Sequence, residues 1–149
     1  MLKKPKGPLV IQGDELWSFV GSKKNKCWSW LALDQGSREI VGCHLGHRDP
    51  SGAQKLWNAL PPVYHQCAVC YTDFYFAYER VLPSKRHKPS AKGSGKTSHI
   101  ERFKNTLRQR ISRLVRKTLS CSKKFQNLRG AVWYFIHHYN ACLRLKTPL

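Results

Sequence analysis

Three strand-like segments joined by short turns open the chain and limit the folds that it can adopt. Residues 9–20, 27–33 and 39–45 each have the side-chain pattern of a β-strand, rich in aromatic and β-branched residues. The turns at 21–25 and 34–37 are short, which suits antiparallel neighbours. The sequence therefore predicts a three-stranded antiparallel meander at the start of the chain.

Helices and shorter strands are predicted to follow. A helix capped by Ser51 is expected to run to Leu60, where Pro61 and Pro62 end it. The segment 67–72 is short and wholly apolar, which is typical of a central strand buried on both faces. The remaining predicted elements are a helix at 74–82, a loop at 83–97 with a short strand near 86–88, a long amphipathic helix at 98–124 and a last helix at 125–143.

This order of elements favours one fold. Three antiparallel strands followed by α/β units describe a mixed five-stranded sheet flanked by helices, which is the ribonuclease-H-like arrangement. No internal repeat or linker divides the 149 residues, so we expect a single domain over residues 1–149.

The charge of the chain indicates its partners. Lys and Arg number 27 against 8 Asp and Glu, a formal net charge of +19. Such a balance points first to nucleic acid and second to an anionic membrane. No apolar run approaches the ~20 residues of a spanning helix, and residues 1–7 lack the apolar centre of a signal peptide. We therefore expect a cytoplasmic protein that binds nucleic acid.

The six cysteines fall inside predicted elements, which suits buried reduced thiols better than a disulfide framework. Cys67 and Cys70 have the spacing of a metal-binding pair. A zinc ribbon needs a second such pair, and the sequence has none. The sequence alone does not decide whether this pair binds a metal.

Three carboxylates are expected to meet in the predicted fold. Asp14 lies in the first strand and Asp73 ends the fourth, and these two strands are neighbours in a ribonuclease-H-like sheet. Glu101 opens the long helix that packs over the same edge. Three converging carboxylates repel one another unless divalent cations neutralise them, and oxygen ligands favour Mg²⁺ or Mn²⁺. Two such ions could activate a water or a 3′-hydroxyl and stabilise the leaving oxygen of a phosphodiester.

Each of these acids also has a structural interpretation. Asp14 could be an edge or turn residue, although Asp is depleted within strands. Asp73 could be a helix N-cap. Glu101 could close a capping box with Ser98.

Other polar and aromatic residues are predicted to be structural or solvated. Glu15 should point to the strand face opposite Asp14 and meet solvent. The tryptophans are expected in the core rather than as base-stacking platforms, namely Trp17, Trp28, Trp30 and Trp133.

Three segments resemble a known family. They are DELWSFVGSKKNKCWSWLALD at 14–34, LWNALPPVYHQCAVCYTDFYFAY at 56–78 and HIERFKNTLRQRISRLVRKTLS at 99–120. The acid-Glu-x-Trp strand, the Thr-Asp after an apolar strand and the Ile-Glu-Arg that opens a helix are similar to those of the insertion-sequence-one transposases, in the DDE superfamily.

The resemblance implies a fold and a chemistry. It implies a ribonuclease-H-like fold, a metal-binding and catalytic triad of Asp14, Asp73 and Glu101, and Mg²⁺ as the cofactor, with Mn²⁺ as a substitute. The implied substrates are double-stranded transposon ends, cut at their inverted repeats, and target DNA, to which the freed 3′-hydroxyl is joined. It further implies a homo-oligomer at work on the bacterial nucleoid.

The chain departs from the family in two respects. Lys104 stands where relatives often carry Asn, whereas Asn105 matches. Complete enzymes of the family also carry an N-terminal zinc ribbon and helix-turn-helix, often joined through translational frameshifting. This chain begins close to the first catalytic strand, so we expect a catalytic part whose end-recognition domain is encoded separately or fused by frameshifting.

Basic residues on the loop and long helix predict a DNA path. They would bind phosphates in a salt-dependent way with little sequence readout. A solvated basic face is the alternative. The predicted residues are Lys85, Arg86, Lys88, Lys92, Lys96, Arg102, Arg108, Arg113, Arg116, Lys117, Lys123 and Lys124.

Two other functions fit the same residues. One is a non-catalytic DNA-binding regulator left by a decayed element. The other is a nuclease on the same fold, which would hydrolyse DNA without joining it.

Overall fold

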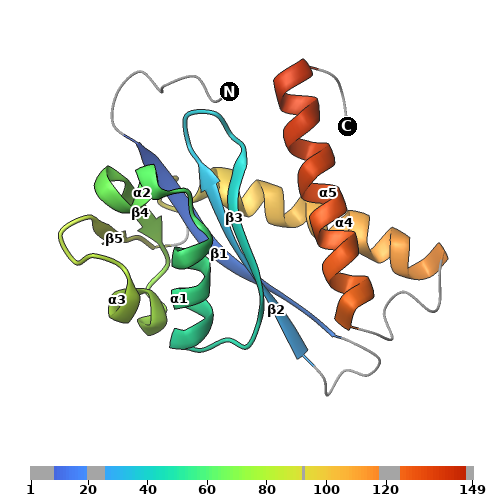
Figure 1. The fold of residues 1–149 in the computed structure, drawn as a ribbon, viewed down its shortest axis with the longest axis horizontal. Coiled ribbons are helices and arrows are strands. Elements are labelled where there is room, and N and C mark those ends of the chain that lie inside the picture. The colour runs from blue at the N-terminus through green and yellow to red at the C-terminus, as the bar shows by residue number, and fades with distance from the viewer. Residues whose placement is uncertain (1–8, 20–25, 92, 118–124, 147–149) are drawn as a thin grey trace.

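A computed structural model of the chain describes residues 9–19, 26–91, 93–117 and 125–146. A five-stranded mixed sheet forms its centre, with strand order β3-β2-β1-β4-β5, and Figure 1 shows it as a twisted layer between helices. β1 pairs antiparallel with β2 and parallel with β4, as the ribonuclease-H-like prediction requires. The strands are β1 (Val10–Phe19), β2 (Lys26–Asp34), β3 (Ile40–Gly46), β4 (Val69–Thr72) and β5 (His87–Pro89).

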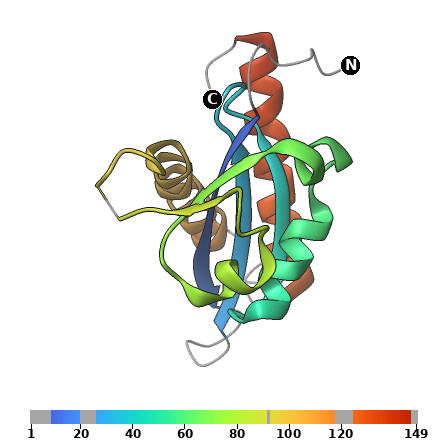
Figure 2. The same cartoon turned by 90° about the vertical axis from the view of Figure 1, so that its left-hand side faces the viewer.

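Helices cover both faces of the sheet (Figures 1 and 2). One apolar core lies between β1, β2 and β3 and the last two helices, and includes Leu31, Phe103 and Val132. A second core lies on the other face, around Trp30 and Tyr78. The helices of the second face are α1 (Pro50–Ala59), α2 (Pro62–Cys67) and α3 (Phe76–Val81), and those of the first are α4 (Ser98–Lys117) and α5 (Phe125–Leu145).

The region between α1 and β4 differs from the sequence prediction. Pro62 does not only end a helix, because it starts α2, and proline suits a first helical turn where the N–H has no intrahelical partner. Cys67 therefore belongs to α2, and β4 begins at Val69. The cap of α1 is Asp49 rather than Ser51, since the Asp49 carboxylate accepts the Gly52 N–H at 3.0 Å. The predicted helical residues 118–124 lie outside the described residues.

The start of α4 is fixed by a side chain from β1. Gln12 is only 1% exposed, and its Oε1 accepts the backbone N–H groups of His99 and Ile100, both at 3.0 Å. These donors have no partner within the helix. Gln12, rather than the alternative capping box of Ser98 and Glu101, thus caps these N–H groups, and it ties the start of α4 to β1.

The tryptophans divide into two groups. Trp30 is fully buried, and Trp28 and Trp133 are partly buried, as a core role predicts. Trp17 is 48% exposed, so its predicted core position is wrong. Trp17 lies on the part of β1 beyond Gln12. There β4 no longer pairs with β1, and it no longer covers the edge of that strand.

Four of the six cysteines can be placed. Cys27, Cys43 and Cys70 are buried thiols outside any disulfide, and Cys142 is buried as well. Burial raises the pKa of Cys43 to about 12 and that of Cys70 to about 11, so both stay protonated near neutral pH. The predicted buried thiols are confirmed at these positions. The side chain of Cys67 and all of Cys121 lie outside the described residues.

Replacing the buried cap of α4 should weaken the fold. We expect Gln12→Leu to lower the free energy of unfolding by about 2 kcal/mol, because it leaves one buried and one part-buried N–H donor unsatisfied at similar side-chain volume. Urea unfolding measures the loss. Gln54→Leu is the matched control, because Gln54 is exposed on α1 and its side chain donates to the exposed Asn58. Equal stability of the two variants would contradict the capping role of Gln12.

Candidate active site

Two predicted site residues meet at one edge of the sheet. β4 pairs with β1 only over Val10 to Gln12, so the edge of β1 is open from that point on. Asp14 follows on the open edge, and its Oδ1 accepts the backbone N–H of Glu15 at 2.8 Å. Asp73 comes directly after β4, and its Oδ1 accepts the Tyr75 N–H at 3.0 Å. The parallel pairing of the two strands thus brings Asp14 and Asp73 together, as predicted.

Glu15 is a third member of this cluster. Carboxylate oxygens of Asp14, Glu15 and Asp73 all lie within 4.8 Å of one another, and Glu15 is only 6% exposed. The prediction that Glu15 is solvated is therefore wrong. Adjacent strand residues do point to opposite faces, but the pairing of β4 with β1 ends at Gln12. Beyond that point the edge of β1 leaves room for both side chains to approach Asp73.

Two groups from separate elements donate hydrogen bonds to the Glu15 carboxylate. The Tyr78 hydroxyl on α3 donates to Oε2 at 2.5 Å. Arg48, in the loop before α1, donates to Oε1 from Nε at 3.2 Å and from Nη2 at 3.0 Å. Burial raises the pKa of Glu15, and the charges of Asp14 and Asp73 raise it further, while these hydrogen bonds lower it. Burial and the Glu15 charge also raise the pKa of Tyr78.

Lys104 balances the charge of Asp14. Its Nζ lies 2.8 Å from Asp14 Oδ2, and the two side chains are 16% and 10% exposed. Lys104 is thus an ionic partner of the first predicted catalytic acid. The carboxylates and these bases share one open hollow, lined by Asp14, Glu15, Leu16, Trp17, Trp28, Arg48, Asp73, Lys104 and Arg108.

Glu101 lies outside the cluster of three carboxylates. It is partly buried in the first turn of α4, and its Oε1 accepts the Thr97 hydroxyl at 3.2 Å. Lys104 follows three residues later, so the two side chains lie on the same face of the helix. The structure therefore brings together two of the three predicted acids and places the third about one turn from the Asp14–Lys104 pair.

Sequence reasoning missed three groups at this site. Glu15 had a signal, because acids are depleted in strands and it directly follows another acid. Tyr78 lies in a predicted helix, and its neighbour Ala77 is also buried. The sequence pattern of that helix does not show that the Tyr78 hydroxyl bonds to Glu15. Arg48 lies in an irregular loop with no periodicity that would place it.

The predicted DNA-binding residues fall into three groups. Arg86 has a structural role, because its guanidinium donates to the backbone oxygens of Tyr64, His65 and Ala68. Lys92, Lys123 and Lys124 lie outside the described residues, as do the side chains of Arg113, Arg116 and Lys117. Those on the described surface are exposed and available to phosphates, namely Lys85, Lys88, Lys96, Arg102 and Arg108.

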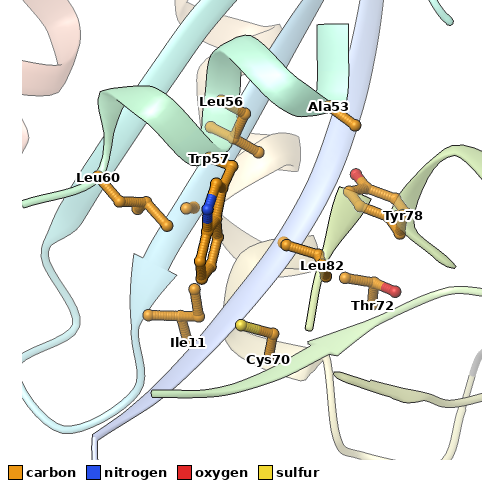
Figure 3. Close-up of a pocket in the computed structure, with 11 residues that line it drawn as sticks. Ile11, Ala53, Leu56, Trp57, Leu60, Cys70, Thr72, Tyr78 and Leu82 are labelled. Atoms are coloured by element: carbon orange, nitrogen blue, oxygen red, sulfur yellow. The ribbon is translucent and has the colours of Figure 1, made fainter. Parts of the chain in front are cut away.

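A second cavity lies behind the site and has a different character. It has a volume of about 20 Å³ and lies between the sheet and helices α1 and α3, where Figure 3 shows Leu56 and Leu60 facing Ile11 and Cys70. Its lining is apolar and its size suits one water at most. The Tyr78 ring lines this cavity while its hydroxyl reaches Glu15. The cavity belongs to the core, and the charged hollow is the candidate site.

Comparison with known sequences gives consistent matches. A family model described as IS1 transposase matches residues 9–140. The chain is 31% identical over 131 residues to the insertion element iso-IS1n protein InsB of Shigella dysenteriae, covering 88% of this chain and 96% of that protein. It is also 31% identical over 128 residues to the IS1 4 protein InsB of Escherichia coli K12, covering 85% and 74%.

Solved structures share the fold at low sequence identity. The catalytic core domain of HTLV-2 integrase, in complex with magnesium and in a trimeric form, matches with a TM-score of 0.56 and 15% identity, covering 83% of this chain and 82% of that one. A chain of the simian T-cell lymphotropic virus intasome matches with a TM-score of 0.62 and 14% identity. The match covers 89% of this chain and half of that longer one. These similarities show the ribonuclease-H-like fold.

Removing the Glu15 carboxylate should destabilise the protein more than neutralising it. We expect Glu15→Ala to lower the free energy of unfolding by about 3 kcal/mol, because a guanidinium and a buried hydroxyl lose their acceptor. Glu15→Gln should cost less, since its amide oxygen still accepts from Tyr78. Chemical denaturation of both variants measures this. Glu79→Ala, at an exposed position on α3, is the control, and a Glu15→Ala stability as high as that of the control would contradict the buried cluster.

Proposed function

Because the chain belongs to the IS1 transposase family, we propose that it is the catalytic domain of a DDE transposase. Its substrates would be the ends of its own element, cut at the 3′ side, and target DNA, to which the freed 3′-hydroxyl is joined. The observation that carries the proposal is the cluster of Asp14 and Asp73 carboxylates at the open edge of β1, inside a hollow that also holds basic side chains.

The donor set fits a hard divalent cation. The clustered ligands are carboxylate oxygens, which suit Mg²⁺ or Mn²⁺ rather than zinc, and the HTLV-2 integrase core of the same fold was solved with magnesium. Asp14 and Asp73 would hold one or two metal ions, and Glu101 would complete the set of ligands from α4. When bound, such ions activate an attacking water or 3′-hydroxyl and stabilise the leaving oxygen.

Basic side chains of the protein would hold the DNA strand. Lys104 and Arg108 line the same hollow as the acids, so they can meet the non-bridging oxygens of a phosphodiester that reaches it. Exposed lysine and arginine side chains outside the hollow would extend the contact along the DNA backbone, with an affinity that falls as the salt concentration rises.

Assembly and location follow from this activity. Joining two element ends to a target requires more than one active site, so we infer a homo-oligomer, and the HTLV-2 integrase core is known in dimeric and trimeric forms. Recognition of the element's ends would come from a separate or frameshift-fused domain. We place the protein in the cytoplasm, at the nucleoid. None of the described helices is long and apolar enough to cross a membrane.

Neutralising one acid should separate catalysis from binding. We expect Asp73→Asn to reduce metal-dependent cleavage of DNA that spans the ends of the chain's own element to background. Salt-sensitive DNA binding should stay intact, because the exposed lysine and arginine side chains are unchanged. Gel-shift and cleavage assays on the same preparation measure both. Cleavage by the variant at the wild-type rate would refute the mechanism.

The same assay separates the competing functions. A transposase yields branched products in which a 3′ end is joined to a second duplex, whereas a nuclease yields only cut DNA. A non-catalytic regulator binds with the same salt dependence and cuts nothing.

Metal binding should appear as stabilisation of the fold. At a concentration 100 times its Kd, Mn²⁺ should add about 2.7 kcal/mol, which raises the Tm of a chain of this size by roughly 5–10 °C. Asp14→Asn should abolish the shift, and Glu79→Gln should retain it. A reduced shift in Glu101→Gln would place Glu101 among the ligands, and an unchanged shift would remove it from the set.

A further inference from the structure

One wall of the charged hollow is aromatic. Trp17 and Trp28 are cross-strand neighbours on β1 and β2, and both line the hollow that contains the carboxylates. Trp17 is 48% exposed there. Phe74, directly after Asp73, is 64% exposed. Trp17 and Phe74 thus present large flat rings to solvent beside the carboxylates.

Arg48 is held rigidly on the same wall. Its guanidinium lies 4.8 Å from the centre of the Trp28 ring and 4.2 Å from that of Tyr75. Two of its nitrogens donate to Glu15, and its backbone oxygen accepts the Tyr75 hydroxyl at 2.9 Å. The Arg48 side chain is still 39% exposed. Because the fork has five N–H donors, some remain for an anion on the open side.

We propose that this wall is a nucleotide subsite, in which Trp17 stacks on an unpaired base next to the phosphate that is cut and Arg48 binds that nucleotide's phosphate. The proposal rests on the proposed function, because it assumes that a DNA strand reaches the carboxylates. A base inside a duplex is covered by its neighbours, so only a base out of the stack can offer its face to Trp17.

Charge favours a nucleotide over a protein partner on this wall. Lys26 Nζ lies 5.4 Å from the centre of the Trp17 ring, and Lys104 and Arg108 also line the hollow. An occupant with a flat ring and a negative charge complements both the rings and the cations. A second copy of this chain, at a net charge of +19, would bring like charge to the same place.

Binding of a fluorescent base tests the subsite without any need for cleavage. The probe is a short single-stranded oligonucleotide with one 2-aminopurine, because stacking tolerates any sequence. The wild-type chain should quench its fluorescence. Trp17→Ala should lose the quenching and bind the single strand about 5- to 100-fold more weakly, with duplex affinity unchanged. Trp17→Phe should retain most of both effects.

Matched variants separate stacking from general loss. Tyr134→Ala removes an aromatic that is 72% exposed on α5 and should change nothing. Arg48→Lys keeps the charge without the fork, so it should weaken single-strand binding while the quenching persists.

Cleavage gives a second reading. Trp17→Ala should cut a fully paired end more slowly than the wild type, and a mismatch at the base beside the cut should restore much of the rate, because that base no longer has to be unpaired. The binding assay does not depend on DNA cleavage. A chain that cuts no DNA would therefore refute the proposed function, and the fluorescence quenching would still test the nucleotide subsite.

Two results would overturn the subsite. One is quenching and single-strand affinity in Trp17→Ala equal to those of the wild type. The other is a wild-type dimer in gel filtration that Trp17→Ala dissociates with single-strand binding unaffected, which would assign the wall to contact between copies of the chain.

Discussion

The short parallel pairing of β1 with β4 is the constraint on which the site depends. It lasts from Val10 to Gln12 and stops, so the backbone of β1 is paired up to the point where the acids begin and open beyond it. At its last paired position, Gln12 holds the start of α4. The same few residues therefore end the ladder, cap the helix and leave room for Asp14, Glu15 and Asp73 to converge.

Converging carboxylates need ionic or hydrogen-bonding partners. In this fold the three partner side chains come from three different elements. Lys104 comes from α4, Arg48 from the loop before α1, and Tyr78 from α3. Tyr78 also belongs to the apolar core behind the sheet. Because these groups join the charged hollow to both layers of helices, the electrostatics of the site and the stability of the fold cannot be changed independently.

Much of this arrangement could be predicted from the sequence, because it depends on periodicity and strand order. The strands follow from alternating patterns and turn residues. The adjacency of β1 and β4, and with it the meeting of Asp14 with Asp73, follows from the ribonuclease-H-like strand order that the sequence of elements favours. The burial of Glu15 does not, because alternation assumes a neighbouring strand on both sides and β4 ends too early. The exposure of Trp17 fails to follow for the same reason. Arg48 lies in an irregular loop, where only tertiary packing positions the side chain.

The position of Lys104 bears on how the site would accept a metal. Its ammonium and a divalent cation on the same carboxylate would repel each other, because like charges ~4 Å apart repel even where solvent screens them. Glu101, on the same face of α4 and bonded only to Thr97 through its carboxylate among the described contacts, carries the opposite charge. The Lys104 ammonium on Asp14 thus makes the charge of the site depend on whether a cation is bound to that carboxylate.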